Sequence, residues 1–195
     1  MNLPNQLTCA RFVLTVIFVV VLSIRGPFAN SIGLVLFILA GITDYLDGAI
    51  ARSRGLITDF GKLMDPLADK IMMASAFILL VPEGAFPAWV AVAIISREFA
   101  ITGLRLLAGN KGVILPSESL GKHKTVWQII AVAYFLVLLS LKEIERVGLI
   151  SASSIIWWEY AWFLGGPILI GIVLILTIYS GVGYLWKNRS LISME

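Results

Sequence analysis

Six stretches of this chain are apolar and long enough to cross a lipid bilayer, and no other feature of the sequence restricts the fold as strongly. A membrane-spanning helix needs about 20 predominantly apolar residues. Short segments that contain glycine or proline, which favour turns, separate consecutive stretches. The pattern predicts helices over about residues 7–24, 32–52, 60–82, 87–107, 120–141 and 160–186.

The composition agrees with a chain that lies mostly in lipid. Apolar residues make up 59% of the 195 positions and charged residues only 14%, against about 45–50% and 25% in a soluble domain. Such a chain is not disordered, not a nucleic-acid-binding tail protein and not a disulfide scaffold. We predict an all-α integral membrane protein with six transmembrane helices in a single domain over residues 1–195, the first helix partly preceded by an interfacial segment.

The N-terminal apolar run has a second interpretation. Residues 12–24 have the length of the apolar segment of a cleaved signal peptide. Only Arg11 precedes this run as a positive charge, however, and no A-x-A cleavage site follows it. We therefore expect the first helix to be retained in the protein.

The basic residues are distributed unequally between the two sides of the predicted membrane domain. Cytoplasmic loops are enriched in Lys and Arg, and one side holds only Arg25, Lys142 and Arg146. We predict that the other side is cytoplasmic, as are both termini. Its basic residues are Arg11, Arg52, Arg54, Lys62, Arg97, Arg105, Lys111, Lys122, Lys124, Lys187 and Arg189. The expected location is a bacterial cytoplasmic membrane, among membrane lipids and without a nucleic-acid partner.

Aromatic residues gather at both ends of the last predicted helix. Tryptophan and tyrosine are enriched at membrane–water interfaces. We interpret the residues at both ends as an interfacial aromatic belt, formed by Trp157, Trp158, Tyr160 and Trp162 at one end and by Tyr184 and Trp186 at the other.

All five aspartates of the chain fall within one window of 26 residues, from position 44 to position 69. Asp44 and Asp47 are three residues apart on one predicted helix, so they share a face. Asp65 and Asp69 are four residues apart on the next helix and share a face in the same way. A short connection makes the two helices neighbours, so the four carboxylates converge near one membrane surface. Ionisable residues in membrane segments are costly and by default indicate function.

A divalent cation relieves the repulsion between clustered carboxylates. Ligands that are all oxygen, without histidine or cysteine, favour Mg²⁺ or Mn²⁺ over zinc. The small residues Gly48, Ala51 and Gly61 let a ligand approach closely, and the guanidinium of Arg52 suits a phosphate. Metals, a groove and a cation together are suited to binding and cleaving a pyrophosphate.

The aspartate window also carries a recognisable motif. It reads DYLDGAIAR over residues 44–52, then eight residues, then GKLMDPLAD over residues 61–69. It resembles the signature D-x2-D-G-x2-A-R-x8-G-x3-D-x3-D of the CDP-alcohol phosphotransferase family, and all eight fixed positions match. NLPNQLTCAR at 2–11, SREF at 96–99, GLR at 103–105 and GKHKT at 121–125 are similar to the phosphatidylglycerophosphate synthase branch.

The resemblance implies a six-helix membrane enzyme, usually a homodimer, that displaces CMP from a CDP-linked donor by attack of an alcohol on the lipid-side phosphorus. The implied cofactor is a divalent metal, two ions of Mg or Mn, bound by Asp44, Asp47, Asp65 and Asp69. Asp69 is also implied as the base that takes the proton of the acceptor hydroxyl. The residues implied to bind CDP-diacylglycerol are Gly48, Ala51, Arg52, Thr58, Gly61 and Thr8.

For this branch the implied acceptor is sn-glycerol 3-phosphate and the product is phosphatidylglycerophosphate, in the first committed step of phosphatidylglycerol and cardiolipin synthesis. Four basic residues suit the phosphate of such an acceptor, namely Arg97, Arg105, Lys122 and Lys124. A solvated positive-inside loop explains basic residues here equally well. Arg97 and Arg105, however, lie within or at the edge of apolar sequence, where an arginine needs an anion. We expect Arg97 to pair with Glu98 or with the phosphate.

Two neighbours of these motifs are expected to have structural roles. Asp59 lies outside the signature and is expected to cap the third helix. His123, between two lysines, is expected to face solvent or lipid headgroups.

Two alternatives remain open at this point. One is the same chemistry with inositol phosphate, serine or phosphatidylglycerol as the acceptor. The other is a cation or proton transporter that uses the intramembrane aspartates. Transporters usually place such acids near mid-membrane on broken helices, whereas these acids cluster near one end of their helices, beside Gly48 and Arg52.

Overall fold

The computed structural model is helical throughout the residues that it describes, which are 3–54, 59–110, 115, 119–150 and 155–189, apart from short turns. The helical elements are α1 (Leu3–Ile24), α2 (Ala29–Arg54), α3 (Asp59–Leu80), α4 (Ala88–Asn110), α5 (Ser119–Arg146), α6 (Ile155–Tyr160), the π-helical turn η2 (Ala161–Gly165) and α7 (Gly166–Lys187).

The described helices form six rods, because α6, η2 and α7 follow one another without a break. Each rod coincides with one predicted stretch, and the ends differ by a few residues. The N-terminal segment that we predicted as partly interfacial is continuous with α1, which already begins at Leu3. The Asp59 position predicted as a cap is the first residue of α3, and its side chain lies outside the described part of the structure.

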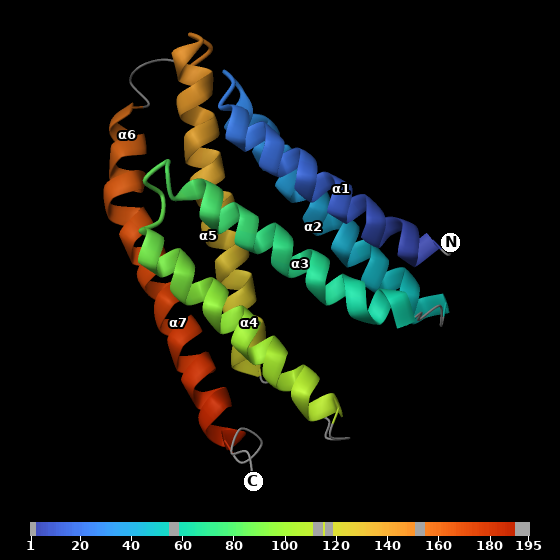
Figure 1. Ribbon diagram of the computed structural model, residues 1–195. Helices are drawn as coiled ribbons and strands as arrows, with labels where there is room; N and C mark the ends of the chain where they lie inside the picture. Colours follow the sequence, from blue (N-terminus) through green and yellow to red (C-terminus); the bar gives the residue numbers. More distant parts are fainter. Residues whose placement is uncertain (1–2, 55–58, 111–114, 116–118, 151–154, 190–195) are drawn as a thin grey trace.

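The rods pack as two connected groups (Figure 1). In the first group, α1 lies against α2 and α3. In the second, α7 lies against α5 and α4, and α5 also packs on α2, which joins the groups. The acid-bearing helices α2 and α3 therefore neighbour α5 and, through α3, α4, which carry the four basic candidates for the acceptor phosphate.

An aromatic chain fills the centre of the bundle. Phe86 lies with its ring centroid 5.0 Å from that of Phe77 and 5.0 Å from that of Phe135, both in edge-to-face geometry. Phe135 in turn meets Trp162 at 5.2 Å. Edge-to-face pairs are favoured by the ring quadrupole. This series of rings connects four parts of the chain, which are α3, the turn that precedes α4, helix α5 and η2.

The π-helical turn η2 has a clear local cause. Pro167 has no backbone N–H, so it cannot donate the helical hydrogen bond to the carbonyl four residues earlier. The Gly166 N–H instead bonds to the carbonyl of Ala161, five residues back. The Tyr134 hydroxyl donates a further hydrogen bond of 2.7 Å to the same carbonyl. The widened turn is therefore held in place from α5.

A buried carboxylate joins α5 to the start of α2. The two oxygens of Glu143 accept four hydrogen bonds of 2.8–2.9 Å from the backbone N–H groups and side chains of Asn30 and Ser31. The first N–H groups of a helix lack partners within the helix, and a negative charge is favoured there by the helix dipole. This clamp fixes the end of α2 that is remote from its aspartates.

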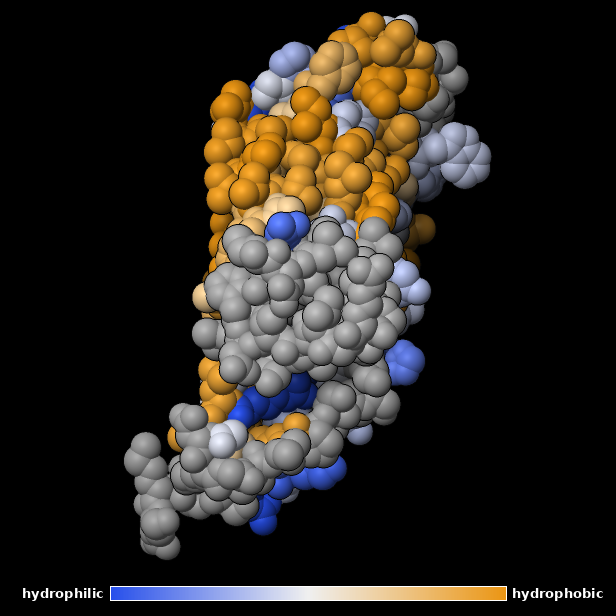
Figure 2. Space-filling view, turned by 90° about the vertical axis from the view of Figure 1, so that its right-hand side faces the viewer, coloured by the Kyte–Doolittle hydropathy of each residue, from blue (hydrophilic) through white to orange (hydrophobic). Residues whose placement is uncertain are grey.

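The outer surface is strongly apolar. Figure 2 shows apolar side chains over the upper part of one face, with hydrophilic ones gathered at the lower end. Within the described residues, two helices are long and apolar enough to cross a membrane, over His123–Arg146 and Trp157–Lys187, and shorter apolar stretches cover Thr8–Ile24 and Ala29–Tyr45. Exposed apolar side chains continue along α1, α2 and α7, among them Val13, Val16, Val20, Val35, Ile38, Ile42, Ile168, Ile175 and Val182. Such a surface suits lipid rather than water.

Candidate active site

The first element of the site is an ion pair between α1 and α2. The Nη1 atom of Arg11 lies 2.7 Å from Oδ1 of Asp44. Arg11 is only 2% exposed, and it is the one charged residue of α1. A buried guanidinium requires an anion nearby, and the first motif aspartate supplies it.

Asp44 and Asp69 line a common groove of about 460 Å³ between α2, α3 and α5. Arg11 shares this polar end of the groove. The remaining wall is mostly apolar and is formed by Phe37, Ile38, Ala40, Gly41, Ile42, Tyr45, Met72, Met73, Ile129 and Ala133. The groove can therefore receive a ligand that has an apolar body and a charged end.

A second cavity, of about 420 Å³, opens on another side of Asp69. Its wall comes from α3, α4, α5 and α7, and it is rich in cationic and hydroxyl groups. The lining residues are Asp69, Lys70, Arg97, Glu98, Ile101, Thr102, Arg105, Gly121, Lys124, Thr125, Val126, Ser180 and Tyr184. Four basic residues beside two acids leave an excess of positive charge, which suits a doubly charged phosphate.

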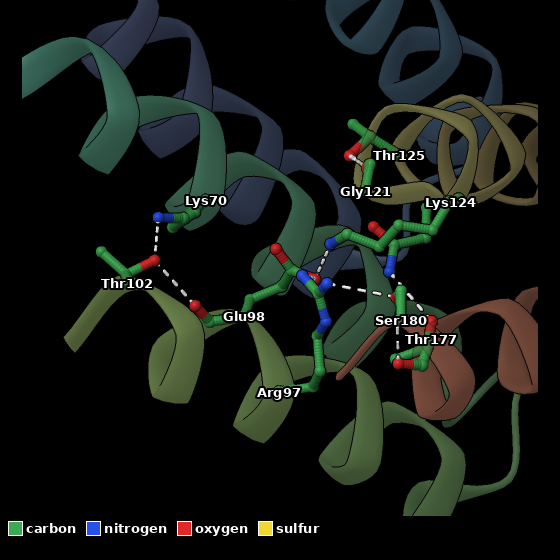
Figure 3. A network of polar contacts seen from close by, with 10 residues as sticks. Lys70, Arg97, Glu98, Thr102, Gly121, Lys124, Thr125, Thr177 and Ser180 are labelled. Atoms are coloured by element: carbon green, nitrogen blue, oxygen red, sulfur yellow. Dashed lines mark hydrogen bonds and ion pairs between the residues drawn. The ribbon is translucent and has the colours of Figure 1, made fainter. Parts of the chain in front are cut away.

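Glu98 holds two of these cations on the cavity wall (Figure 3). Its Oε1 atom lies 3.2 Å from Nη1 of Arg97 and also pairs with the Nζ atom of Lys124. Lys124 is 3% exposed, so its charge depends on this partner. The expected pairing of Arg97 with Glu98 is confirmed.

Lys70 of α3 reaches across to α4 in the same cavity. Its Nζ atom donates a hydrogen bond to Oγ1 of Thr102, and Thr102 donates to the carbonyl of Glu98 at 2.7 Å. These contacts orient the lysine beside Asp69, its neighbour in sequence and in the cavity lining.

The last helix contributes to the site as well. Ser180 accepts a hydrogen bond of 3.1 Å from Nη2 of Arg97, and the Tyr184 hydroxyl accepts one of 3.1 Å from Nε of Arg105. Tyr184 is 3% exposed. Its assignment to the interfacial belt is therefore wrong, whereas the exposed Trp157, Tyr160 and Trp186 agree with a belt position.

The structure brings together Asp69, Arg97, Arg105 and Lys124 in one cavity and Asp44 with Asp69 in the adjoining groove. Thr8 is buried in α1 and is not among the residues that line the cavity or the groove. Thr58 lies outside the described residues. Seven further candidates stand in described helices, but their side chains lie outside the description, namely Asp47, Gly48, Ala51, Arg52, Gly61, Asp65 and Lys122.

Sequence reasoning missed four residues of the site as candidates, Arg11, Lys70, Ser180 and Tyr184, and named Glu98 only as a partner of Arg97. A charge inside an apolar stretch indicates function, and this signal was available for Arg11. No comparable signal marks Ser180 and Tyr184, because serine and tyrosine are ordinary residues near the end of a membrane helix. Among the described side chains no group of three potential metal ligands is found.

Comparisons with known proteins show which family the sequence resembles. The model of the CDP-alcohol phosphatidyltransferase family matches residues 1–179. The CDP-diacylglycerol–glycerol-3-phosphate 3-phosphatidyltransferase of Bacillus subtilis (strain 168) is 39% identical over 199 residues, which cover 96% of this chain and 95% of that protein. The protein of the same name from Rickettsia bellii is 37% identical, with 94% and 93% covered. A probable phosphatidylglycerophosphate synthase of Mycobacterium tuberculosis (strain H37Rv) is 41% identical over 142 residues, with 71% and 68% covered.

Proposed function

The chain belongs to the CDP-alcohol phosphatidyltransferase family, and on this premise we propose that it transfers the phosphatidyl group of CDP-diacylglycerol to sn-glycerol 3-phosphate. The products are phosphatidylglycerophosphate and CMP. The relatives from Bacillus subtilis and Rickettsia bellii carry the name of this reaction. The chain is thus an integral membrane enzyme, and its reaction is the first committed step of phosphatidylglycerol and cardiolipin synthesis.

The observation that carries the proposal is the position of Asp69. This one carboxylate lines both the basic cavity and the mostly apolar groove. A transferase that joins a small anionic alcohol to a lipid needs one site for each, with the reacting atoms between them. Asp69 stands at that junction.

The basic cavity is the proposed site of the acceptor. Arg97, Arg105 and Lys124 provide the cations for its phosphate, and Lys122 next to them remains a candidate for the same role. A guanidinium can bind phosphate oxygens with two parallel hydrogen bonds. Binding the phosphate here leaves the acceptor hydroxyl directed toward Asp69, which lines the same space.

The groove is the proposed site of the lipid donor. Phe37, Ile38, Met72 and Ile129 offer an apolar wall for the diacylglycerol portion, and the charged end at Asp44 and Asp69 is where the pyrophosphate belongs. Gly48, Ala51, Arg52, Thr58 and Gly61 are proposed to bind the CDP portion. Thr8 has weaker support, because it does not line the groove.

A divalent metal fits the acidic end of this groove. Asp44 and Asp69 face the same space from two helices, and carboxylate oxygens without histidine or cysteine suit Mg²⁺ or Mn²⁺. Asp44, Asp47, Asp65 and Asp69 are the residues that would hold two such ions. When bound, these ions neutralise phosphate charge and stabilise the incoming and leaving oxygens.

The chain's own groups account for the proton and the orientation of the reactants. Asp69 accepts the proton of the acceptor hydroxyl as its oxygen forms a bond to the lipid-side phosphorus. The bond from that phosphorus to the bridging oxygen breaks, and CMP leaves with the bonding electrons. The apolar wall of the groove excludes water, which would otherwise compete as the nucleophile.

The proposal also includes a topology and an assembly. Six membrane-spanning helices, with both termini and the active site on the cytoplasmic side, agree with the distribution of basic residues. The location is a bacterial cytoplasmic membrane, and the working form is a homodimer, as the resemblance implies.

Purified protein in detergent tests the proposal. CDP-diacylglycerol is supplied with sn-glycerol 3-phosphate, inositol phosphate, serine or phosphatidylglycerol in separate reactions, and CMP release is measured. We expect release with glycerol 3-phosphate, loss of release on chelation, and recovery with Mg²⁺ or Mn²⁺.

The other outcomes identify the alternatives. Release with another acceptor alone would contradict the assigned substrate while leaving the chemistry in place. No release with any acceptor, together with metal-ion or proton flux in protein-containing vesicles, would instead identify a transporter.

A further inference from the structure

We propose that Ser180, Gly181 and Tyr184 form an arginine-positioning face on α7, which sets the affinity of the enzyme for the acceptor phosphate. The inference rests on the proposed function, because it concerns the acceptor site of that reaction. None of the three residues belongs to the aspartate motif, and all three come from the last helix. They act through Arg97 and Arg105 of α4, so they are positioning residues rather than catalytic ones.

Tyr184 fixes Arg105 in two ways. Its hydroxyl accepts the hydrogen bond of the Nε atom, and its ring centroid lies 5.4 Å from the Cζ atom of the guanidinium. A cation within about 6 Å of an aromatic ring is attracted by the ring quadrupole. Because Tyr184 occupies only the Nε donor, the four N–H groups on the two Nη atoms remain available for a phosphate.

Ser180 and Gly181 fix Arg97 in a corresponding way. The Ser180 hydroxyl accepts the hydrogen bond of Nη2. A Cβ atom placed on Gly181 would lie 2.8 Å from Cγ of Arg97. The absence of a side chain at Gly181 therefore lets the Arg97 side chain lie directly against α7. Cγ is close to the α4 backbone, and relief of that contact requires the whole arginine side chain to move.

The three residues are well placed for this role. Ser180, Gly181 and Tyr184 are all buried, and Ser180 and Tyr184 line the basic cavity directly. Residues 180 and 184 are one helical turn apart, so they share one face of α7. That face packs on α4, where Ile101 and Leu104 enclose Tyr184. A long arginine side chain loses conformational entropy when it is ordered by a ligand, and fixed partners on α7 supply that order before the substrate arrives.

Tyr184→Phe is the first test, with Tyr179→Phe as its control. The substitution keeps the ring and removes the hydroxyl that fixes Arg105. Tyr179 is on the same helix but is 68% exposed and contributes nothing to the cavity lining. We expect Tyr184→Phe to raise the KM for glycerol 3-phosphate roughly five- to tenfold, an effect of the size of one typical lost hydrogen bond, because Arg105 is solvent-exposed. The KM for CDP-diacylglycerol should stay unchanged. In the control variant, Tyr179→Phe, the KM values for both substrates should stay unchanged.

Gly181→Ala is the second test, with Gly183→Ala as its control. A Cβ atom on Gly183 meets nothing within 4 Å, so the two variants add the same methyl group to the same helix in different surroundings. We expect Gly181→Ala to raise the acceptor KM about tenfold or more and to raise the inhibition constant of inorganic phosphate with it. Gly183→Ala should match the unmodified enzyme.

A double-mutant comparison separates positioning from helix packing. If Tyr184 acts through Arg105, then Tyr184→Phe has no further effect on the acceptor KM when Arg105 is already alanine. A purely structural role would instead lower the melting temperature and the maximal rate in both backgrounds. Additive effects on the acceptor KM would overturn the inference.

The failure of this inference is distinguishable from the failure of the proposed function. Absence of CMP release from the unmodified enzyme with glycerol 3-phosphate contradicts the proposed function. In that case, stabilisation of the unmodified protein by inorganic phosphate, measured as a shift in melting temperature, still reports on the arginine site. Equal shifts in the unmodified protein, Tyr184→Phe and Gly181→Ala contradict the inference alone.

Discussion

The guanidinium of Arg11 lies 2.7 Å from the carboxylate of Asp44 and joins α1 to the aspartate motif on α2. Arg11 is almost fully buried, whereas the Asp44 side chain is about half exposed toward the groove. The first aspartate of the motif thus has a positive partner from the first helix, and α1 lies against the groove although it carries none of the aspartates.

Replacement of Arg11 by alanine is expected to lower both stability and activity. It removes the partner of Asp44 and adds uncompensated negative charge to the cluster. Charged hydrogen bonds contribute about 1.5–3 kcal/mol, so the melting temperature should fall by several degrees and CMP release should fall at least tenfold. Arg25→Ala is the control, because Arg25 is exposed and makes only a weak ion pair. Its Nε atom lies 3.8 Å from Oε1 of Glu83, which belongs to a separate turn. Equal behaviour of the two variants would contradict a role for Arg11.

Asp69→Asn is expected to abolish CMP release while preserving the fold. The amide keeps the size of the side chain but neither accepts the acceptor proton nor supplies a charged metal ligand. Loss of a general base alone lowers rates by about 10²–10⁴-fold. The matched control is Asp59→Asn, since asparagine serves as well as aspartate at a helix start. Residual activity in Asp69→Asn above one tenth of the unmodified rate would exclude Asp69 as the base.

Lys124→Met is expected to weaken the acceptor and not the lipid donor. Methionine keeps much of the apolar length of the side chain, but the cavity loses one cation and Glu98 loses one partner. Truncation of one member of a buried ion pair costs about 2–5 kcal/mol, which corresponds to an increase of more than tenfold in the KM for glycerol 3-phosphate. His123→Gln is the control at the adjacent, exposed position. An unchanged acceptor KM in Lys124→Met would remove Lys124 from the phosphate site.

Gly165→Ala tests the π-helical turn as a structural device. A Cβ atom there would clash with the Tyr134 hydroxyl, which itself donates a hydrogen bond to the Ala161 carbonyl. Overpacking of this kind costs about 1–3 kcal/mol, and the melting temperature should fall accordingly. Gly171→Ala, where a Cβ atom meets nothing within 4 Å, should leave stability unchanged or raise it slightly, because alanine favours helix. A melting temperature as high in Gly165→Ala as in Gly171→Ala would show that the turn tolerates a side chain.

The helical framework could be predicted from the sequence because apolar length is a local property. Each stretch of about 20 apolar residues became one rod, and the breaks fell at the predicted turns. The π-helical turn could not be predicted in the same way. Pro167 predicts a distortion of the helix. The Tyr134 hydroxyl that stabilises the distortion, however, comes from another helix, 27 residues before its acceptor Ala161 in the sequence.

The site was predictable to the extent that its residues follow the family motif or carry charge in apolar sequence. Asp44, Asp69, Arg97 and Lys124 were predicted in this way, and they line the groove or the basic cavity. Tyr184 was misassigned, because an aromatic residue near a helix end has the same sequence signature whether it faces lipid or a neighbouring helix. The packing of α7 on α4 decides between these positions, and that packing depends on contacts between segments about 80 residues apart.

The uninterrupted length of the last rod has a geometric consequence. Its apolar part, Trp157–Lys187, has 31 residues, which at about 1.5 Å per residue extend about 46 Å. Even at a tilt of about 40°, such a rod covers about 36 Å of depth, more than the hydrocarbon thickness of about 30 Å. With the exposed Trp157 at one interface, the excess length falls at the other end of the rod, beginning near Tyr184. On the proposed assignment, an acceptor bound at Arg105, beside Tyr184, therefore meets the enzyme at the depth of the headgroups and does not have to enter the hydrocarbon.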